Sequence, residues 1–527
     1  MIRRRFALMG LLAVLFALGW WTGHASTHDR YADLDVFMEI LKRVEASYVE
    51  QVDPSKAIKG AVDGMLHDLD PYSQYLDEQD WKALQDVTRG EFSGIGIVVG
   101  VRDGYPVVIS PIEGSPAWRA GLRSGDIIVR IDGKPSSGLS IEGAAKLLRG
   151  PKGTAVKVAV AREGEDGEHE VEIVRREIET RSVPYSFVFS GDLGYVRLSN
   201  FSEKSGEEVR TAVQNLRTRG ARRFVLDLRL NPGGLLDQAV DVSEQFLPRG
   251  SVVVSTRGRL RAEEQKFKAD GPAPDLSSPL VVLVDEGSAS ASEIVAGALQ
   301  DLDRALLVGR VTFGKGSVQS VFPLRGNTTA LKLTTALYYT PSGRSIHRIR
   351  TKPNALAAED DEEGADGASA DSTAARPAFR TAGGRTVFGG GGITPDIDLA
   401  ADSLPPLSAQ IERRTLTFRF ANKWMNQHPK ATVPGKLPDE VWNEFVDWVR
   451  SEKVAGTPAE FAAQRDILER SVRRELARRS VGDAAAARVA LEGDPVFLKA
   501  AEVLRRAARP SDVFATAVND RSTDPRR

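Results

Sequence analysis

The sequence predicts a multidomain α/β protein, and three observations lead to this prediction. The chain has 527 residues, too many for a single hydrophobic core, so about two to four domains are expected. It is 41% hydrophobic and 27% charged, which is the composition of a folded protein and not of a disordered one. Between residues 185 and 345, short apolar runs alternate with amphipathic segments, the pattern of an α/β domain.

Composition excludes several classes of function. Lys and Arg total 71 against 72 for Asp and Glu, a formal net charge of -1, whereas nucleic-acid binding needs a basic surplus. There is no cysteine, which excludes disulfides, thiolate metal sites and cysteine nucleophiles. None of the six histidines lies in an HExxH pattern. We therefore expect no metal, no cofactor and no nucleic-acid partner.

The first 26 residues have the plan of an export segment. Arg3, Arg4 and Arg5 precede an apolar run from Phe6 to Trp21, and small residues follow it. This order is typical of a secretory signal peptide, while the length also permits a retained membrane anchor. The arginines keep the N-terminus inside in either case. The prediction is an exported protein of the periplasm or cell envelope, with membrane contact through this segment if it is retained.

The rest of the chain divides by the period of its apolar residues. Residues 27–89 are predicted to be a small helical domain, with one helix over 54–69, because apolar residues recur there at three- and four-residue steps. Residues 90–175 change to Val- and Ile-rich strands with one helix between them. The expected strands are 95–101, 106–112, 126–131 and 155–161, and the expected helix is 141–148.

Residues 176–403 form the predicted α/β core. Its expected strands are 194–198, 224–228, 280–284 and 305–308, and its expected helices are 205–216, 236–246 and 292–302. Residues 355–392 carry an acidic run followed by Ala, Gly and Ser, which predicts a disordered surface insertion. Residues 404–527 are predicted to be a helical appendage. Its apolar stripes fit either packing within the appendage or a surface for oligomerisation or an adaptor protein.

Two segments of the core place backbone N–H groups and serines at strand-to-helix junctions. Residues 226–234 (Leu-Asp-Leu-Arg-Leu-Asn-Pro-Gly-Gly) run from a strand into a glycine turn, where N–H groups can point at a ligand as in an oxyanion hole. Residues 287–293 (Gly-Ser-Ala-Ser-Ala-Ser-Glu) follow the next buried strand. A serine there is exposed at the edge of the sheet, and Ser290 with Glu293 also fits a helix capping box. The pattern does not distinguish which of Ser288, Ser290 and Ser292 is the reactive serine.

A third segment offers a base. Lys315 lies between two glycines, in Thr312-Phe-Gly-Lys-Gly316, and glycines permit close enclosure by neighbouring backbone. No histidine is well placed, and lysine is the known substitute as a base for a serine nucleophile. Such a lysine must be neutral, so its pKa has to lie well below the ordinary lysine value. Burial achieves that and exposure to solvent does not, so this mechanism requires Lys315 to be enclosed.

Together these segments resemble the C-terminal processing, or tail-specific, proteases, serine peptidases with a Ser–Lys dyad and a crotonase-like α/β core. The motifs 287–294, 312–316, 338–344 and 392–397 occur in the order found in that family. The resemblance implies that Ser290 is the nucleophile, Lys315 the general base and Gln319 its assistant. It implies an oxyanion hole made of backbone N–H groups from Gly233 or Gly234 and from Ala291.

Residues 90–175 likewise resemble a PDZ domain, through 114–117 (Gly-Ser-Pro-Ala) and 120–126 (Ala-Gly-Leu-Arg-Ser-Gly-Asp). PDZ domains add a peptide strand to a sheet edge and capture its terminal carboxylate in backbone N–H groups. The resemblance implies a carboxylate-binding turn at Phe92, Ser93, Gly94, Ile95, Gly96 and Ile97, beside the helix over 141–148.

The resulting prediction is an exported endopeptidase that recognises free C-termini and cleaves or degrades envelope proteins from that side. Its partners would be proteins or peptides with free C-termini. One alternative is a PDZ adaptor whose protease domain is silent or gated. Another is an acyl-CoA enzyme, because the crotonase fold shares the paired oxyanion donors, but export argues against a cytoplasmic substrate.

Overall fold

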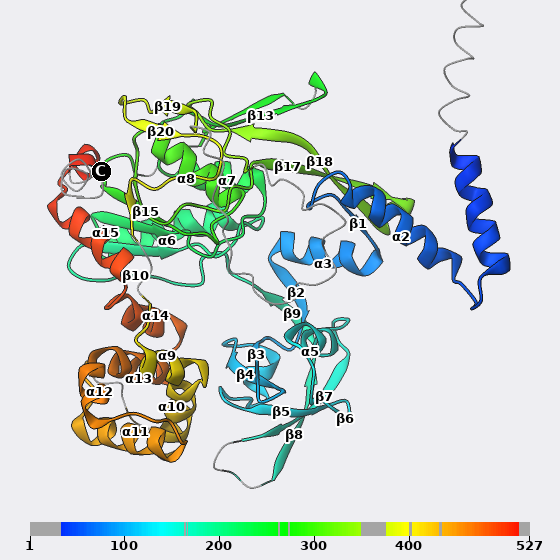
Figure 1. Cartoon of the computed structure of the whole chain (residues 1–527). Helices are drawn as coiled ribbons and strands as arrows, with labels where there is room; N and C mark the ends of the chain where they lie inside the picture. Colours follow the sequence, from blue (N-terminus) through cyan, green and yellow to red (C-terminus); the bar gives the residue numbers. More distant parts are fainter. Residues whose placement is uncertain are drawn as a thin grey trace, which may run out of the picture. The chain divides into compact units, whose positions relative to one another are not determined.

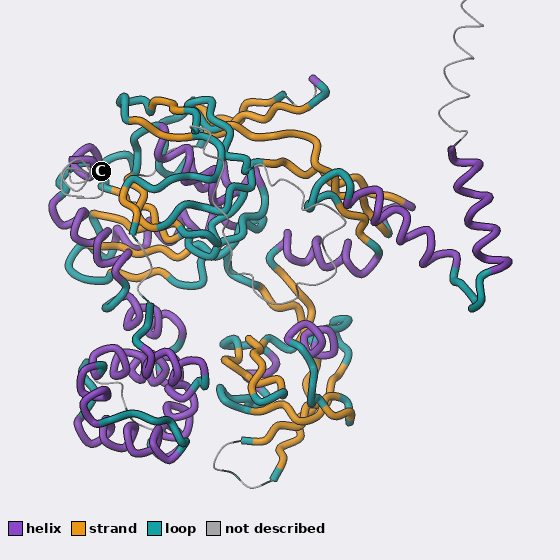
Figure 2. The backbone as a smooth tube through the Cα atoms, viewed as in Figure 1, coloured by secondary structure: helices purple, strands orange, loops and turns teal. Residues whose placement is uncertain are grey.

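The structure is a computed structural model that describes residues 33–162, 165, 167–261, 264–271, 275–348, 376–399, 403–429, 431 and 435–515. Contacts divide the chain into two compact units, Met1–Trp81 with Gln319–Thr334, and Lys82–Val318 with Thr335–Arg527. Figures 1 and 2 show their elements along the chain. The predicted export segment lies outside the described residues. Within the described part, no helix has the length and apolarity to cross a membrane.

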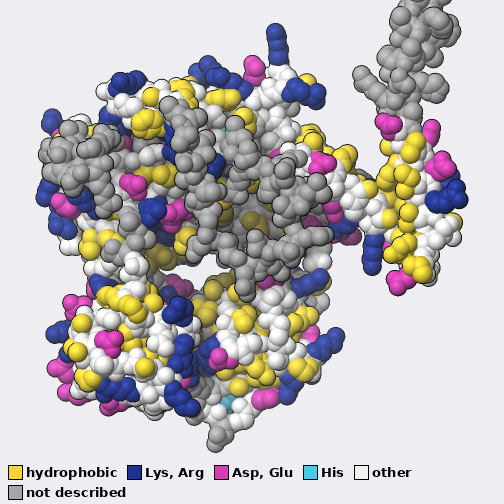
Figure 3. All heavy atoms as spheres, in the orientation of Figure 1, with side chains coloured by type: hydrophobic (Ala, Val, Ile, Leu, Met, Phe, Trp, Pro, Cys, Tyr) yellow, Lys and Arg dark blue, Asp and Glu magenta, His cyan; other side chains and the backbone are white. Residues whose placement is uncertain are grey.

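The first unit combines helices near the N-terminus with a hairpin from much later in the sequence. Residues 33–47 are helical and expose apolar side chains, among them Leu34 and Ile40. Hydrophobic side chains, in yellow, run along this helix in Figure 3. Helix α2 (Pro54–His67) follows, capped by Asp53. Strand β1 (Gln74–Leu76) pairs antiparallel with Ala330–Lys332 of β18 (Thr329–Tyr339). The predicted helical domain therefore also contains a strand that pairs with a hairpin distant in sequence.

The β-rich part of the second unit has the strand and helix order of the PDZ prediction. Helix α3 (Glu78–Arg89) leads into β2 (Glu91–Gly94), which pairs with β9 (Arg176–Glu179). A sheet of order β3-β4-β5-β7-β8 follows, with β6 beside β5. Its members are β3 (Ile97–Arg102), β4 (Tyr105–Pro111), β5 (Ile127–Ile131), β6 (Lys134–Pro135), β7 (Ala155–Ala161) and β8 (Glu168–Val174), with helices α4 (Pro116–Arg119) and α5 (Ile141–Leu148). Strand β3 is an edge of this sheet.

A mainly parallel sheet forms the centre of the α/β core. Its order is β10-β11-β12-β15-β16-β21, parallel from β11 onward. The strands are β10 (Ser186–Val188), β11 (Leu193–Arg197), β12 (Arg223–Asp227), β15 (Leu280–Val284), β16 (Leu306–Gly309) and β21 (Ile397–Asp398). Helices α6 (Ser205–Thr218), α7 (Leu236–Ser243) and α8 (Ala291–Asp301) share one apolar cluster with the sheet. The strand and helix predictions for this core are confirmed to within a few residues.

The two faces of the sheet are covered by different parts of the chain. In β15, Val282 and Val284 face the cluster that contains α8, whereas Val281 and Leu283 face a second cluster that contains α15 (Pro495–Arg506). A strand buried on both faces is a continuous apolar run, and this is the sequence pattern that predicts β15. Helix α15 thus completes the core of the α/β domain.

The C-terminal helices therefore serve two packing regions. Helices α9 (Pro406–Arg413), α10 (Leu416–Gln427), α11 (Asp439–Ser451), α12 (Pro458–Ala463) and α13 (Arg465–Ser480) enclose their own apolar cluster, which includes Phe420, Phe445 and Leu468. Leu491, at the end of α14 (Asp483–Leu491), and α15 instead join the cluster on the sheet. The predicted helical C-terminal region is confirmed over its described residues, and its helix α15 packs against the core.

The remaining strands correct one prediction. Strand β13 (Val252–Gly258) pairs with β14 (Gln265–Lys268) and with residues 336–339 of β18, and β17 (Ser317–Leu324) pairs with β18. Strands β19 (Ala378–Arg380) and β20 (Thr386–Phe388) form a hairpin inside the segment 355–392 that was expected to be disordered. That expectation is wrong for residues 376–392, because Arg385 pairs with Asp303 and Asp396 and anchors the hairpin to the core. The acidic run 359–363 lies outside the described residues.

Candidate active site

The glycine turn and the serine run meet at one edge of the parallel sheet. They follow β12 and β15, which are neighbours, and the carboxyl ends of parallel strands share an edge. Gly233 has φ +96, and a Cβ there would lie 2.8 Å from Ser290 Cβ and 2.9 Å from the Ala291 nitrogen. Only glycine permits this approach, so the turn lies directly against the start of α8.

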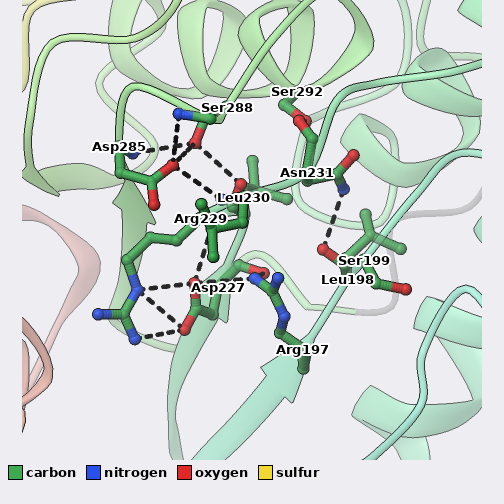
Figure 4. Close-up of polar contacts among 12 residues, drawn as sticks. Arg197, Leu198, Ser199, Asp227, Arg229, Leu230, Asn231, Asp285, Ser288 and Ser292 are labelled. Carbon is green, nitrogen blue, oxygen red and sulfur yellow. Dashed lines mark hydrogen bonds and ion pairs between the residues drawn. The ribbon is translucent and has the colours of Figure 1, made fainter. Parts of the chain in front are cut away.

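Asn231 holds the turn against the serine run. It is fully buried, and its Nδ2 donates to the Leu198 carbonyl at 2.9 Å (Figure 4). Its Oδ1 accepts the Gly233 N–H at 2.9 Å, and its carbonyl accepts the Ala289 N–H at 3.0 Å and Ser292 Oγ at 2.9 Å. The Gly233 N–H is therefore occupied. Among the residues that the structure describes, the N–H groups of Gly234 and Ala291 have no acceptor.

The structure distinguishes the three serines that the sequence left open. Ser288 is buried and donates to the Leu228 carbonyl at 2.9 Å, and Ser292 is buried and donates to Asn231. Both hydroxyls are thus used inside the protein, as Figure 4 shows for Ser288. Ser290 is the one that is partly exposed. Its φ of 55° and ψ of -113° are strained for a residue with a side chain, as at the strand-to-helix turn that presents a nucleophile.

Glu293 joins the Ser290 segment to the Lys315 loop. The carboxylate is fully buried. Its Oε2 accepts the backbone N–H of Ser290 and of Lys315, each at 2.9 Å, and its Oε1 accepts Thr312 Oγ1 at 2.5 Å and the Gly314 N–H at 2.8 Å. Burial raises the pKa of Glu293, although the donated hydrogen bonds act in the opposite direction. The predicted cap at Glu293 is present and also fixes the lysine loop.

Tyr338 also connects the Ser290 segment with the Lys315 loop, through their backbone carbonyl groups. Its side chain is buried, and its hydroxyl donates to the Lys315 carbonyl at 2.6 Å and lies 3.2 Å from the Ser290 carbonyl. A Cβ at Gly316 would lie 2.7 Å from the His347 nitrogen, so neighbouring backbone encloses the loop as its glycines predicted. Lys315 itself is partly buried.

Gln319 belongs to the other compact unit. Its Nε2 donates to Thr334 Oγ1 at 3.4 Å, across the hairpin of β17 and β18. The assistance of Gln319 to Lys315 therefore remains a prediction.

A buried ion network supports the strand that leads into the glycine turn. Asp227 accepts hydrogen bonds from Arg197 and Arg229, at 3.2 and 2.6 Å at the closest (Figure 4). It also accepts one from the Tyr195 hydroxyl at 2.8 Å. Burial acts to raise the pKa of Asp227, but the charge and hydrogen bonds of Arg229 outweigh it and hold that pKa below its ordinary value. Arg229 also donates to Asp494, the N-cap of α15, at 2.6 Å.

The predicted peptide site of the β-rich part lies beside an edge strand of its sheet. Residues 95 and 96 lie between β2 and the edge strand β3, with φ +78 at Gly96. The Ile95 and Gly96 carbonyls accept the N–H groups of Ala117 and Ile112, which fixes the turn. Helix α5 contacts β3, and Val98 and Ile141 are both 46% exposed. The Arg149 guanidinium lies over the Phe92 ring, with Arg149 Cζ 5.1 Å from the ring centre.

Comparisons with known proteins identify the family. Peptidase family S41 matches residues 192–356, a PDZ domain matches 107–162, and the N-terminal domain of the activating protease CtpB matches 22–80. The carboxy-terminal-processing protease of Bartonella bacilliformis is 46% identical over 330 residues, covering 62% of this chain and 75% of that protein. The chain belongs to peptidase family S41. It is a carboxy-terminal processing serine protease with a PDZ domain, and the similarity favours this activity over that of a silent adaptor.

Two further proteins are similar over a comparable length. The carboxy-terminal processing protease CtpA of Bacillus subtilis is 36% identical over 334 residues, covering 63% of this chain and 70% of that protein. The solved photosystem II D1 C-terminal processing protease is 28% identical, with a TM-score of 0.38, covering 71% of this chain and 95% of that chain.

Sequence reasoning missed the residues that hold this S41 site together. In the sequence, Asn231 is only a member of the glycine turn, and Tyr338 is only a member of a motif. The pattern predicts a helix cap at Glu293, and its hydrogen bonds to the lysine loop have no local signal. Within the described ranges, no group of three or more His, Asp and Glu side chains is arranged to hold a metal.

Proposed function

We propose that this S41 peptidase cleaves peptide bonds through an acyl-enzyme on Ser290. Ser290 Oγ attacks the scissile carbonyl while neutral Lys315 takes its proton, and the resulting ammonium protonates the leaving amine. Water then releases the acyl group with the same lysine as base, and Gln319 assists Lys315. The observation that carries this proposal is that the partly exposed serine and the lysine loop share one buried carboxylate, Glu293.

The oxyanion that forms during the attack is proposed to bind the N–H groups of Gly234 and Ala291. An oxyanion hole needs donors that are not already used. Because the Gly233 N–H is donated to Asn231, the geometry favours Gly234 of the two glycines that the sequence left open. Gly233 then serves by permitting close approach to Ser290.

The PDZ domain is proposed to select substrates by a free C-terminus. A peptide would add to the edge strand β3, with its carboxylate at the turn Phe92–Ile97 and its side chains beside α5. The protease would thereby cleave or degrade proteins from their C-terminal side. The basic and apolar start of the chain supports export to the periplasm or cell envelope, where the substrates would be envelope proteins.

The dyad is tested by Ser290→Ala and Lys315→Ala, with Lys134→Ala, at an exposed lysine of β6, as the matched control. Cleavage of a fluorogenic peptide with a free carboxyl end should vanish in the first two variants and persist in the third, while circular dichroism stays unchanged. A fluorophosphonate should add its mass to the wild type but not to Ser290→Ala. Retained cleavage in either folded dyad variant would overturn the assignment.

Selection by the C-terminus is tested separately with the same peptide as its carboxyl amide. The amide should be cleaved with a higher KM, because the PDZ turn loses the charge that it binds. Equal kinetics for acid and amide would remove the PDZ part of the proposal and leave the dyad untouched.

A further inference from the structure

Leu230 combines two unfavourable features at the edge of the sheet that carries Ser290. Its backbone has φ +51, a left-handed conformation that costs a residue with a Cβ roughly 1–2 kcal/mol and that glycine or asparagine adopts readily. Its side chain is 73% exposed. Neither the turn nor the interior of the protein therefore requires a leucine at this position.

The position of Leu230 relative to the serine run is fixed. Its N–H donates to Asp285 Oδ1 at 2.8 Å, and the same oxygen accepts the Gly287 N–H at 3.0 Å (Figure 4). A Cβ at Gly287 would lie 2.8 Å from Leu230 Cα and 2.9 Å from Leu230 Cδ2. The leucine thus contacts the start of the serine run while most of its surface remains open to solvent.

The neighbours of Leu230 show that this exposure is local. Asn231 is fully buried and Arg229 is partly buried, whereas the strained backbone turns the Leu230 side chain outward. An exposed aliphatic side chain held rigidly beside a reactive serine has its apolar surface available to a molecule that arrives from outside. In a peptidase, the molecule that arrives at this edge is a polypeptide.

We propose that Leu230 is a specificity-determining residue that contacts an apolar side chain of the substrate near the scissile bond. This inference rests on the proposed function, since it takes Ser290 as the reacting group. Aliphatic contact of this kind discriminates between apolar and polar side chains of the substrate, and its loss costs about tenfold in selectivity. Strain that persists in a turn is consistent with such a role, because a residue that only closed the turn would not need it.

The test uses Leu230→Asn in the full-length protein, since asparagine tolerates the left-handed conformation. Two peptide series with free carboxyl ends place Leu, Phe, Ser or Gln at each position flanking the cleavage site, which mass spectrometry identifies. At one position, the ratio of kcat/KM for apolar over polar residues should fall about tenfold. The midpoint of thermal unfolding should stay or rise, because the strain is relieved.

Leu276→Asn is the matched control. Leu276 is 46% exposed but precedes β15, at the opposite end of the strand from the serine run, so its substitution should leave the selectivity unchanged. An unchanged ratio in Leu230→Asn, or an equal loss on every peptide, would overturn the inference and leave Leu230 as a turn residue. Ser290→Ala is measured in parallel, because cleavage by that variant would refute the proposed function itself, whatever Leu230 does.

Discussion

Ser290 and Lys315 donate their backbone N–H groups to the same carboxylate oxygen, Glu293 Oε2, each at 2.9 Å. Their carbonyl groups in turn both lie within hydrogen-bond distance of the Tyr338 hydroxyl. The two segments proposed to carry the reaction are therefore fixed to each other through the backbone, on both sides. Because these contacts fix the backbone of Ser290 and Lys315, they also fix where the two side chains begin. We therefore expect the geometry of the site to depend on Glu293 and Tyr338.

Replacing Glu293 with glutamine should disable the site without removing any proposed reacting group. The amide supplies one acceptor oxygen where the carboxylate has two, and its NH2 would face N–H groups that are themselves donors. We expect kcat to fall about 100-fold through misplacement of the dyad, and stability to fall by about 1–3 kcal/mol through unsatisfied buried donors. Peptide kinetics and urea unfolding measure the two effects.

Glu286→Gln is the control for that experiment. Glu286 lies in the connection between β15 and α8, with a side chain that is 64% exposed and 3.4 Å from Arg310, so its neutralisation should change neither quantity appreciably. A folded Glu293→Gln enzyme with the wild-type kcat would show that the shared carboxylate does not position the dyad.

Replacing Tyr338 with phenylalanine should loosen the carbonyl side of the same arrangement. The variant keeps the buried ring and loses the hydrogen bond to Lys315, which should cost about 1 kcal/mol of stability and about tenfold in kcat. Tyr339→Phe is the matched control. It also removes one tyrosine hydroxyl, and the ring at position 339 keeps its contact with Arg257, whose Cζ lies 4.3 Å from the ring centre. Equal kinetics for the two variants would argue against a positioning role for Tyr338.

The sequence predicted the centre of the molecule well because burial leaves a local pattern there. Strands such as β15 are continuous apolar runs, and the serine run with Glu293 carries a capping signal. Three features had no such signal. The pairing of β1 with β18 joins segments far apart in sequence, the apolar face of α15 does not reveal which surface covers it, and residues 376–392 have the composition of a loop although Arg385 anchors them. The choice of Ser290 over Ser288 and Ser292 depends on burial, which three identical side chains do not encode.

The contribution of the contact between α15 and the end of β12 should be measurable through Asp494. Asp494 Oδ1 caps α15, while Oδ2 accepts from Arg229, two residues beyond the end of β12. Asp494→Asn keeps the cap, because asparagine caps as well as aspartate, and removes the charge. We expect a loss of about 1–2 kcal/mol and a decrease of a few-fold in kcat, with KM unchanged, as the strand that carries the glycine turn loses one support.

Asp192→Asn is the comparison variant for Asp494→Asn. Asp192 pairs with Arg223 at 2.6 Å, at the other end of β12, and Arg223 also donates to the Ala507 carbonyl beyond α15. Its loss should cost similar stability by urea unfolding and leave kcat unchanged. The same fall in kcat for both variants would mean that general destabilisation, and not the support of the turn, is responsible.

The pH dependence of stability should report the Asp227 network. Because the pKa of Asp227 is lower in the folded protein than in the unfolded chain, its carboxylate stabilises the fold above the ordinary aspartate pKa of about 3.9, and this contribution is lost as the pH falls through the folded value. Asp227→Asn leaves Arg197 and Arg229 without their buried partner and should cost about 3 kcal/mol at pH 7. Urea unfolding from pH 7 to pH 3 should show a constant difference in the free energy of unfolding between wild type and variant, which narrows only below about pH 4.

Asp447→Asn is the control for this experiment. Its side chain is 79% exposed, so the free energy of unfolding should differ little from that of the wild type at any pH. If the difference in free energy of unfolding between wild type and Asp227→Asn narrows already near pH 6, the pKa of Asp227 is raised in the folded protein. The effect of burial on that pKa would then exceed the effect of Arg229.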